Sequence, residues 1–391
     1  MPHLPPLRLT HAKTLIGGQL ADHALTIADG KITDGAAPEL NLSGYLVLPG
    51  IIDLHGDGFE RHLSPRPSAP FDKTRALSSV AAELAVNGIT TAWLAQSWSW
   101  EGGFRSGEAT VALLCALDAA RPGLLSDLRL QIRLETHVID EHDAVLAAVM
   151  RHGVDYVVFN NHLPEAQEMA NNRPDRLAQW AAQSLRSGDE MMAILRAAQA
   201  DEPGVPAALR ALAARFAGLG VRMGSHDDGD AETRAFYRGL GAPISEFPTT
   251  VAAAQAAHNA GEPVLMGAPN VVRGGSQTGN IAAVDLIEEG LVDALMSDYY
   301  YPALPQSAWA LVDHHLCTLP QAWAMISGNP ARIMGLPDRG HLGKGARADI
   351  AVVNPETQRV EMTLCEGRLA HLSGELARRV MASVPRLTET V

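Results

Sequence analysis

The central part of the chain alternates between short apolar runs and longer Ala/Leu-rich stretches. The short runs, rich in Val and Ile, have the length of buried β-strands, and the stretches between them have the length and composition of helices. Eight strands are predicted, at residues 47–55, 88–96, 128–137, 154–162, 221–228, 243–250, 263–270 and 293–300. Eight strand–helix repeats over about 290 residues are typical of an α/β protein of the (β/α)8 barrel type, which usually takes about 250 residues.

Both ends of the chain have a different pattern. Residues 1–49 carry short alternating segments with a turn at Asp29-Gly30, and residues 346–373 repeat this pattern with turns of their own. Neither end is long enough for an independent core. We therefore expect a small β-sandwich-like domain built from residues 1–49 and 344–391. It would flank a catalytic barrel over 50–343 with a helical insertion near 165–205.

Composition limits the classes of partner. The 391 residues are 47% hydrophobic, which is enough for a large core, and the net charge of −13 disfavours binding to nucleic acid or to an anionic membrane. No run approaches about 18 apolar residues, so no membrane segment is expected. Cys115, Cys317 and Cys365 match no zinc spacing and indicate reduced thiols. These features predict a cytoplasmic protein with a small-molecule substrate; we also expect a homo-oligomer.

Side chains that can bind metal or transfer protons stand where the predicted strands end. They are His55 and Asp57, Glu135 and His137, His162, His226 with Asp227 and Asp228, Glu246, and Asp298. In (β/α)8 barrels the chemistry lies at this end. A single histidine here is most often structural, an aspartate can cap a turn, and Glu246 could pair with an arginine. Together, however, so many acids and imidazoles require a cation. The pattern predicts one or two divalent metal ions, with zinc favoured over manganese or iron and Glu135 suited to bridge two.

Two further segments could bind phosphate. Residues 267–280, GAPNVVRGGSQTGN, place Arg273 before Gly274 and Gly275, and the loops after strands 7 and 8 of such barrels often bind phosphate. Beside the first strand, ERHLSPRPS offers Arg61 and Arg66. The alternatives are a flexible turn for the glycine-rich segment and a solvated loop for the arginines.

The segments LPGIIDLHGD and GHLGKGARADIAVVN, with the discontinuous β domain, resemble the amidohydrolase superfamily. The first strand carries His-x-Asp in place of the commoner His-x-His. DLHGDGFERHLSPRP, GSHDD, ISEFPTT, MGAPNVVRGGSQTGN and SDYYYP are similar to diphosphatases of phosphonate metabolism. The resemblance implies a metal-dependent hydrolase that cleaves the triphosphate of a ribosyl phosphonate 5-triphosphate, leaving the 5-phosphate and releasing pyrophosphate.

The same resemblance implies roles for individual residues. The metal ligands would be His55, Asp57, Glu135, His162 and His226. Asp298 would accept the proton of the attacking water, and Arg273, with Arg61 and Arg66, would counter charge on the phosphoryl oxygens. Gly274 and Gly275 would bind phosphate, and Asp227, Asp228 and His137 would support the ligands, His137 also being an alternate ligand.

Two alternatives remain from the sequence. The first is an amidohydrolase that cleaves a C–N bond on the same metal scaffold: a deacetylase, deaminase or cyclic amidase. Arg66, Arg273 and the glycine-rich loop argue against it, because a neutral amide needs no phosphate cradle. The second is a barrel that serves only as a binding or scaffold subunit. The polar residues at nearly every strand end argue against that.

Overall fold

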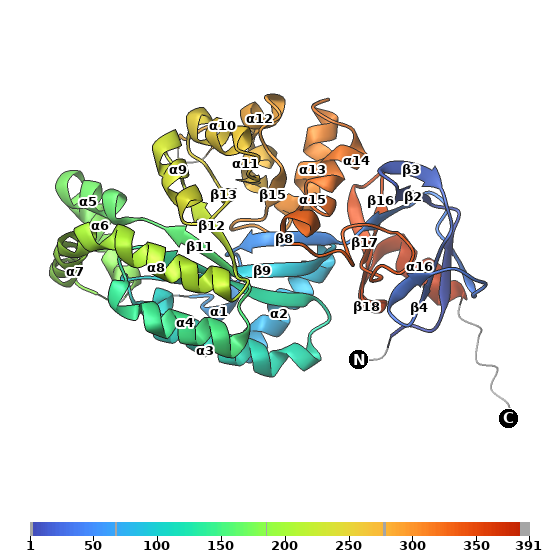
Figure 1. Cartoon of the computed structure of the whole chain (residues 1–391). Helices are drawn as coiled ribbons and strands as arrows, with labels where there is room; N and C mark the ends of the chain where they lie inside the picture. The colour runs from blue at the N-terminus through green and yellow to red at the C-terminus, as the bar shows by residue number, and fades with distance from the viewer. Residues whose placement is uncertain (1–2, 67–68, 185, 277–278, 384–391) are drawn as a thin grey trace.

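The computed structural model describes residues 3–66, 69–184, 186–276 and 279–383. Within them, eight parallel strands form one sheet in sequential order, as predicted for the barrel (Figure 1). These strands are β8 (Ile51–Gly56), β9 (Ile89–Trp98), β10 (Asp127–Glu135), β11 (Tyr156–Asn160), β12 (Arg222–His226), β13 (Ile244–Glu246), β14 (Val264–Gly267) and β15 (Ala294–Met296). The (β/α)8 prediction is confirmed.

The barrel closes between its first and last strands through a few specific contacts. A single parallel bridge joins Gly56 to Asp298. Below it, the buried Asp53 carboxylate accepts hydrogen bonds from the Ser297 backbone N–H (3.0 Å) and hydroxyl (2.5 Å). Burial raises the pKa of Asp53, while the Ser297 hydrogen bonds lower it. Side-chain hydrogen bonds therefore supplement the short backbone ladder at the seam.

Helices follow the barrel strands along the chain and cover the outside of the barrel. They are α1 (Glu60–Leu63), α2 (Lys73–Val86), α3 (Gly107–Ala120), α4 (His142–His152), α8 (Val205–Gly218), α9 (Ala231–Gly239), α10 (Val251–Asn259), α11 (Ala268–Arg273), α12 (Ala283–Glu288), α13 (Ala303–Asp313), α14 (Leu319–Ala324) and α15 (Gly328–Ile333). In α2 the Asp72 side chain accepts from the Arg75 N–H at the N-cap. Its buried Leu77, Val80 and Leu84 recur at helical spacing, so one face packs on the sheet.

Strand β10 shows how one strand serves both the core and the site. Its even-numbered residues, such as Leu130 and Leu134, are buried in the apolar layer under the helices. Its odd-numbered residues face the barrel interior, where Gln131 donates to the Leu54 carbonyl (3.2 Å). The interior face of β10 is therefore polar along its length, with Arg129, Gln131, Arg133 and Glu135 in order.

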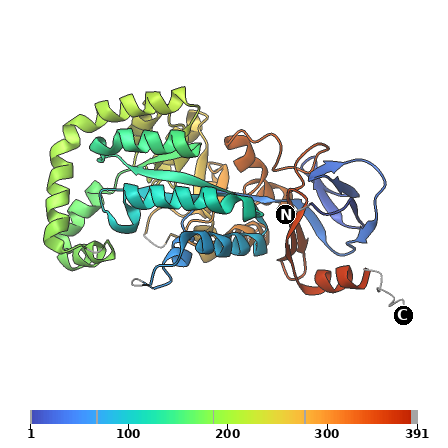
Figure 2. The same ribbon diagram turned by 90° about the horizontal axis from the view of Figure 1, so that it is seen from below.

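Three helices lie between β11 and α8. They are α5 (Leu163–Asn172), α6 (Pro174–Gln183) and α7 (Gly188–Asp201), and they share a separate apolar cluster that includes Leu163, Leu177 and Leu195. Figure 2 shows them at the end of the molecule opposite the terminal sheets. Because this unit has its own core, it can extend beyond the barrel without weakening it.

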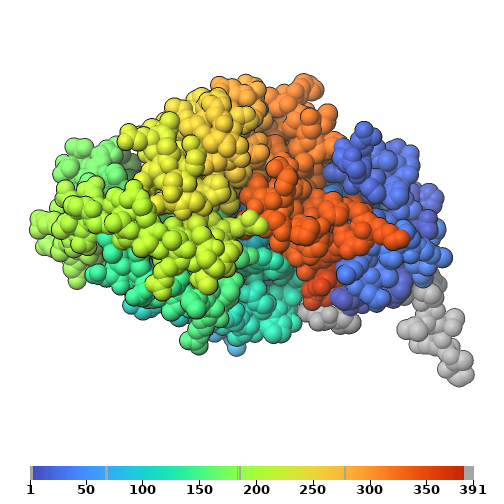
Figure 3. Space-filling view, viewed as in Figure 1, coloured from blue at the N-terminus to red at the C-terminus, as the bar shows by residue number. Residues whose placement is uncertain are grey.

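The two ends of the chain form two further sheets that pack together. One has the order β5-β4-β1-β6 and the other β18-β17-β16-β7-β2-β3. The strands are β1 (Leu7–Thr10), β2 (Lys13–Ile16), β3 (Gln19–Asp22), β4 (Leu25–Ala28), β5 (Lys31–Thr33), β6 (Glu39–Asn41), β7 (Leu46–Pro49), β16 (Ile350–Asn354), β17 (Arg359–Cys365) and β18 (Arg368–Leu372), followed by helix α16 (Gly374–Ser383). Their shared core joins Leu9, Ile27 and Val47 to Ile350 and Leu364. Figure 3 shows the first part of the chain (blue) packed against its last part (red) at one end of the molecule. The expected small β domain from both termini is confirmed.

The expectation of one strand over residues 47–55 was wrong. The segment divides at Gly50 into β7, which pairs with β16 and β2 of the terminal sheets, and β8, which opens the barrel. A Cβ atom at Gly50 would overlap the Thr90 side chain, so only glycine lets the chain pass so closely between the two sheets. Within the described residues, no helix has both the length and the apolar character needed to cross a membrane.

Candidate metal centre

Three non-glycine residues in the left-handed backbone region stand just after barrel strands. They are Asp227 (φ 60°) after β12, Phe247 (φ 52°) after β13, and Asp298 (φ 54°) shortly after β15. Each donates its N–H to the neighbouring strand, Asp227 to Glu246 and Asp298 to His55. This conformation is uncommon for residues with a side chain and concentrates at functional sites. It marks the carboxyl-terminal rim of the barrel as the site.

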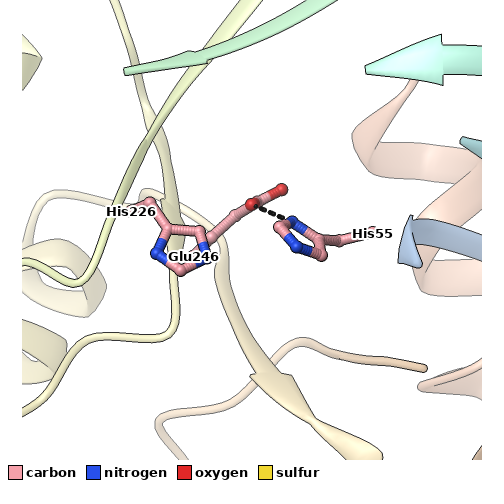
Figure 4. A group of neighbouring side chains, drawn as sticks. All are labelled: His55, His226 and Glu246. Carbon is pink, nitrogen blue, oxygen red and sulfur yellow. Dashed lines mark hydrogen bonds and ion pairs between the residues drawn. The ribbon is translucent and has the colours of Figure 1, made fainter. Parts of the chain in front are cut away.

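The first group of possible ligands, here the His55 cluster, comprises His55, His226 and Glu246. One ligand atom from each lies within 4.8 Å of the others. His55 Nδ1 is 2.7 Å from Glu246 Oε2, and the two imidazole rings are 5.2 Å apart (Figure 4). The Phe247 ring lies against both imidazoles, at 5.0 and 4.9 Å, and closes one side of the cluster.

Glu246 is buried but stabilised as a carboxylate. Its Oε1 accepts from the Tyr156 hydroxyl (2.6 Å) and from Gln131 Nε2 (2.7 Å). Burial acts to raise its pKa, but His55, the charge of His226 and the Tyr156 hydrogen bond hold the pKa of Glu246 below its ordinary value. The partner of Glu246 is thus His55 rather than the arginine considered from the sequence. Glu246 itself was not predicted as a ligand.

The second group, here the Glu135 cluster, comprises Glu101, Glu135 and His162. His162 Nδ1 is 2.6 Å from Glu135 Oε1 and 3.9 Å from Glu101 Oε1. Asn160 Nδ2 also donates to Glu135 Oε1 (2.9 Å). Burial would lower the pKa of His162, but the charge and hydrogen bond of Glu135 raise it, and the pKa of Glu135 is lowered in return. This is a tightly paired acid and imidazole.

Two tryptophans and an arginine position the acids of the Glu135 cluster. Trp100 Nε1 donates to Glu135 Oε2 (3.2 Å), and Trp180 Nε1 on α6 donates to Glu101 Oε2 (2.5 Å). Arg105 adds a hydrogen bond to the same Glu101 oxygen (2.9 Å). The helical insertion thus reaches the site through Trp180. Glu101 was not predicted from the sequence, because it lies in the loop after β9 rather than on a strand.

Asp57 and Asp298 lie together at the seam of the barrel. The Asp57 N–H donates to the Asp298 carbonyl (2.9 Å), and the Asp298 N–H donates to the His55 carbonyl (3.0 Å). Burial, and next the charge of Asp57, raise the pKa of Asp298 to about 6. It is therefore ionised at neutral pH, as a proton acceptor must be. Within the described residues, neither aspartate belongs to the two clusters.

The three residues expected to support the ligands are placed differently from one another. Asp227 Oδ2 lies 2.8 Å from His226 Nδ1, though without hydrogen-bond geometry. Asp228 instead pairs with the buried Arg234 (3.1 Å) and accepts from Ser225 (2.7 Å), a contact that holds α9 to β12. His137 contacts Thr136 (3.0 Å) beyond the end of β10 and lines a separate depression of about 430 Å³. Of the three, only Asp227 contacts a cluster residue.

Two of the three expected phosphate-binding arginines lie at Tyr299. Arg61 donates to the Tyr299 carbonyl (3.1 Å) and pairs with Glu83, and Arg273 Nη1 donates to the Tyr299 hydroxyl (3.3 Å). Arg66 lies exposed on the loop after α1. Both arginines thus contact Tyr299, the residue that follows Asp298 in the sequence, beside the rim.

The expected phosphate loop has a different geometry. The chain enters α11 directly after β14, so Gly274 and Gly275 lie at the carboxyl end of a helix. Their N–H groups donate to the Val271 (3.2 Å) and Asn270 (3.0 Å) carbonyls. A phosphate is disfavoured there, because the N–H groups are used and the helix dipole is negative at this end. Residues 277–278 of this segment lie outside the described part.

The chemistry of both clusters fits divalent metal. Imidazole nitrogens and carboxylate oxygens are the donors that borderline metals take, and the groups come from different strands at one rim. His226 adds a buried Nδ1 that has no hydrogen bond within the described residues.

Comparison with known proteins agrees with this fold. A sequence model described as the Amidohydrolase family matches residues 58–371, beginning just after His55 and Asp57. The α-D-ribose 1-methylphosphonate 5-triphosphate diphosphatase of Escherichia coli (strain K12) is 31% identical over 371 residues, covering 90% of this chain and 97% of that protein. The chain therefore belongs to the amidohydrolase family, whose members are metal-dependent hydrolases.

Solved structures are similar in fold at lower identity. The crystal structure of an amidohydrolase matches with a TM-score of 0.65 at 14% identity, covering 94% of this chain and 99% of that one. N-acetylglucosamine-6-phosphate deacetylase from Pasteurella multocida matches with a TM-score of 0.60 at 11% identity, covering 93% and 99%. At such identities the likeness supports the architecture alone.

Proposed function

We propose that the protein is a metal-dependent diphosphatase. It would cleave the triphosphate of a ribosyl phosphonate 5-triphosphate between the α and β phosphoryl groups, in phosphonate catabolism. The observation that supports this most is the likeness to the E. coli diphosphatase along 90% of the chain. The two acid–imidazole clusters at one rim suit such a reaction, since phosphoanhydride hydrolysis often employs metal ions.

The proposed metal ligands are those expected from the sequence, with two additions. His55, Asp57, Glu135, His162 and His226 remain, and Glu246 and Glu101 join them from the two clusters. One or two ions would bind, zinc being expected first and manganese or iron next. A bound divalent ion would lower the pKa of water and offset charge on phosphoryl oxygens.

Residues of the chain itself would accept the proton of the water and bind the negatively charged phosphates. The water oxygen would bond to the α-phosphorus while the bond from that phosphorus to the bridging oxygen breaks, and pyrophosphate would leave with the electron pair. Asp298 would accept the proton of the water, since its carboxylate is ionised at neutral pH. Arg273 and Arg61, both at Tyr299, would bind the departing phosphates.

A substrate panel tests this proposal. Protein stripped with a chelator and reloaded with zinc or manganese is assayed for pyrophosphate release from ribosyl 5-triphosphates, including the 1-methylphosphonate, and from ATP. N-acyl amino acids and cyclic amides complete the panel. We expect metal-dependent pyrophosphate release from the ribosyl triphosphates. Turnover of the amides alone would instead establish a C–N hydrolase and overturn the proposal.

A further inference from the structure

The interior face of β10 carries one cation whose hydrogen-bonding needs are unmet. At the start of the strand, Arg129 is held by Asp127 (3.0 Å) and Asp155 (2.6 Å). Gln131 in the middle donates to Glu246, and Glu135 at the end belongs to the Glu135 cluster. Between these two lies Arg133, directly below the rim.

Arg133 is largely enclosed and forms a loose ion pair with Asp57. Its side chain is 11% exposed, and its Nε is buried without a hydrogen-bond partner. The nearest carboxylate oxygen, Asp57 Oδ2, is 4.0 Å from Nη1, which is too far for a hydrogen bond. A guanidinium carries five N–H donors, and within the described residues the contact with Asp57 leaves the Nε–H of Arg133 unused.

Arg133 lies among the site's acids. Burial is the main influence on the pKa of Asp298, Asp227 and Glu135, and the charge of Arg133 acts on all three to lower it. Arg133 also precedes Glu135 by two residues on the same face of β10, and its Nη1 lies 4.0 Å from Asp57 Oδ2, so the guanidinium is close to the Glu135 cluster and to the seam. An anion that bound between the clusters would come within its reach.

The free-energy cost of burying an unused donor of Arg133 indicates that a ligand binds there. Buried donors without partners are unfavourable by about 1–3 kcal/mol each, more when charged. The acids nearby do not satisfy them. A phosphoryl group would, because its oxygens match the planar N–H fork of an arginine in two parallel hydrogen bonds.

We propose that Arg133 forms an anion-binding subsite in the reaction centre and contacts the phosphoryl group under attack. The identity of the substrate rests on the proposed function, whereas anion binding by Arg133 does not. This subsite is distinct from the exposed Arg61 and Arg273, which lie beside Tyr299 at the rim. It replaces the glycine-rich segment as the main phosphate contact.

The test measures anion binding without turnover. Isothermal titration of metal-loaded protein with pyrophosphate, methylphosphonate and, as a carboxylate probe, N-acetylglycine is carried out on wild type, Arg133→Gln and Arg133→Lys. We expect Arg133→Gln to weaken pyrophosphate affinity at least tenfold at unchanged metal content. Arg133→Lys should weaken it less, since an ammonium keeps the charge but loses the fork.

Arg129→Gln is the matched control, because it removes an arginine from the same face of the same strand. It should lower the melting temperature and leave pyrophosphate affinity within twofold. Equal affinity in wild type and Arg133→Gln would overturn the subsite, as would a loss of bound metal without a change in anion affinity, or a preference for the carboxylate probe. If Arg133→Gln does not fold, the anion affinity and metal content of Arg133→Lys are judged by the same criteria.

The two proposals can fail separately. Arg133-dependent pyrophosphate binding without hydrolysis of any triphosphate would refute the proposed function and leave the subsite standing. Metal-dependent triphosphate hydrolysis with an anion affinity that is independent of Arg133 would support the proposed function and refute the subsite. With both intact, we expect Arg133→Gln to reduce kcat by about 10²–10³, because the contact strengthens as charge develops on the phosphoryl oxygens.

Discussion

Asp298 combines a left-handed backbone, deep burial and a raised pKa in one residue. Its backbone lies between His55 and Asp57, so its position depends on the closure of the barrel. Its place near the end of the last strand could be predicted from the strand pattern. Its pKa could not, because that follows from burial and from Asp57, which lies far away in the sequence.

Removing the Asp298 carboxylate should abolish most activity and leave the fold intact. Asp298→Asn keeps the shape but cannot accept a proton, so we expect kcat to fall by about 10²–10⁴. Pyrophosphate release measures the loss of activity. Metal analysis and thermal melting verify that the variant keeps its metal and its fold. Asp285→Asn, the same change at an exposed position of α12, is the control. Retained activity in Asp298→Asn would exclude this residue as the base.

Glu246 shows what strand periodicity misses. The sequence predicts a polar residue at the end of the sixth strand, but its partner His55 lies 191 positions away. Only the circular order of the strands brings the two within 2.7 Å.

Glu246→Gln should weaken metal binding. The amide cannot serve as an anionic ligand or as a charged partner of His55, so we expect a loss of affinity of about 10–100-fold. Competition with a chromogenic chelator measures it. Glu288→Gln, on the exposed part of α12, should bind metal with the affinity of the wild type. Equal affinity in Glu246→Gln and wild type would remove Glu246 from the metal centre.

Strands and loops differ in how far the sequence predicts their role. His55, Glu135 and His226 lie on strands, where the period of two assigns each side chain to a face. Glu101 and Gly274 lie in connections, whose geometry depends on the elements they join. Glu101 was accordingly missed and Gly274 misplaced, whereas Glu246 was placed correctly at a strand end but not predicted as a ligand.

Asp127 at the start of β10 should stabilise the fold in a pH-dependent way. Burial opposes its ionisation, but Arg129 and Arg339 lower its pKa to about 2. Its stabilising contribution is present above the unfolded pKa near 3.8 and is lost as the pH falls towards 2. We expect Asp127→Asn to lower the free energy of unfolding by about 2 kcal/mol at pH 7, and by less at pH 3.

Urea unfolding at the two pH values measures this difference. Asp143→Asn removes a solvent-exposed ion pair with Arg215 and serves as the control, with an expected change below about 0.5 kcal/mol. If Asp127→Asn loses the same free energy of unfolding at pH 7 and at pH 3, the electrostatic explanation is contradicted.

In the whole molecule, the chain passes from the terminal sheets into the barrel at Gly50. One apolar core joins both chain ends, and a second lies under the barrel helices and reaches into the terminal sheets through Leu15, Leu48 and Val353. Composition and turn signals predict both the terminal β domain and the barrel. They do not predict that one apolar run, residues 46–56, is shared between them, because a buried run looks alike in either sheet.

Gly50→Ala should destabilise the protein, since the added methyl group would overlap the Thr90 side chain. We expect a loss of about 1–3 kcal/mol in the free energy of unfolding. Gly123→Ala introduces the same group where nothing lies within 4 Å, and should be nearly neutral. Thermal and urea unfolding compare the two. Similar effects from both would show that the junction tolerates a side chain.

Residue order alone is sufficient to predict the barrel, the terminal β domain and the rim on which histidines and acids gather, because each depends on spacing along a short stretch of chain. Four features arise only from folding. They are the pairing of His55 with Glu246, the joining of Glu101 to Glu135, the use of the Gly274 and Gly275 N–H groups inside a helix end, and the enclosure of Arg133 beside Asp57. These features depend on contacts between distant segments, and such contacts exist once the strands have closed into a ring.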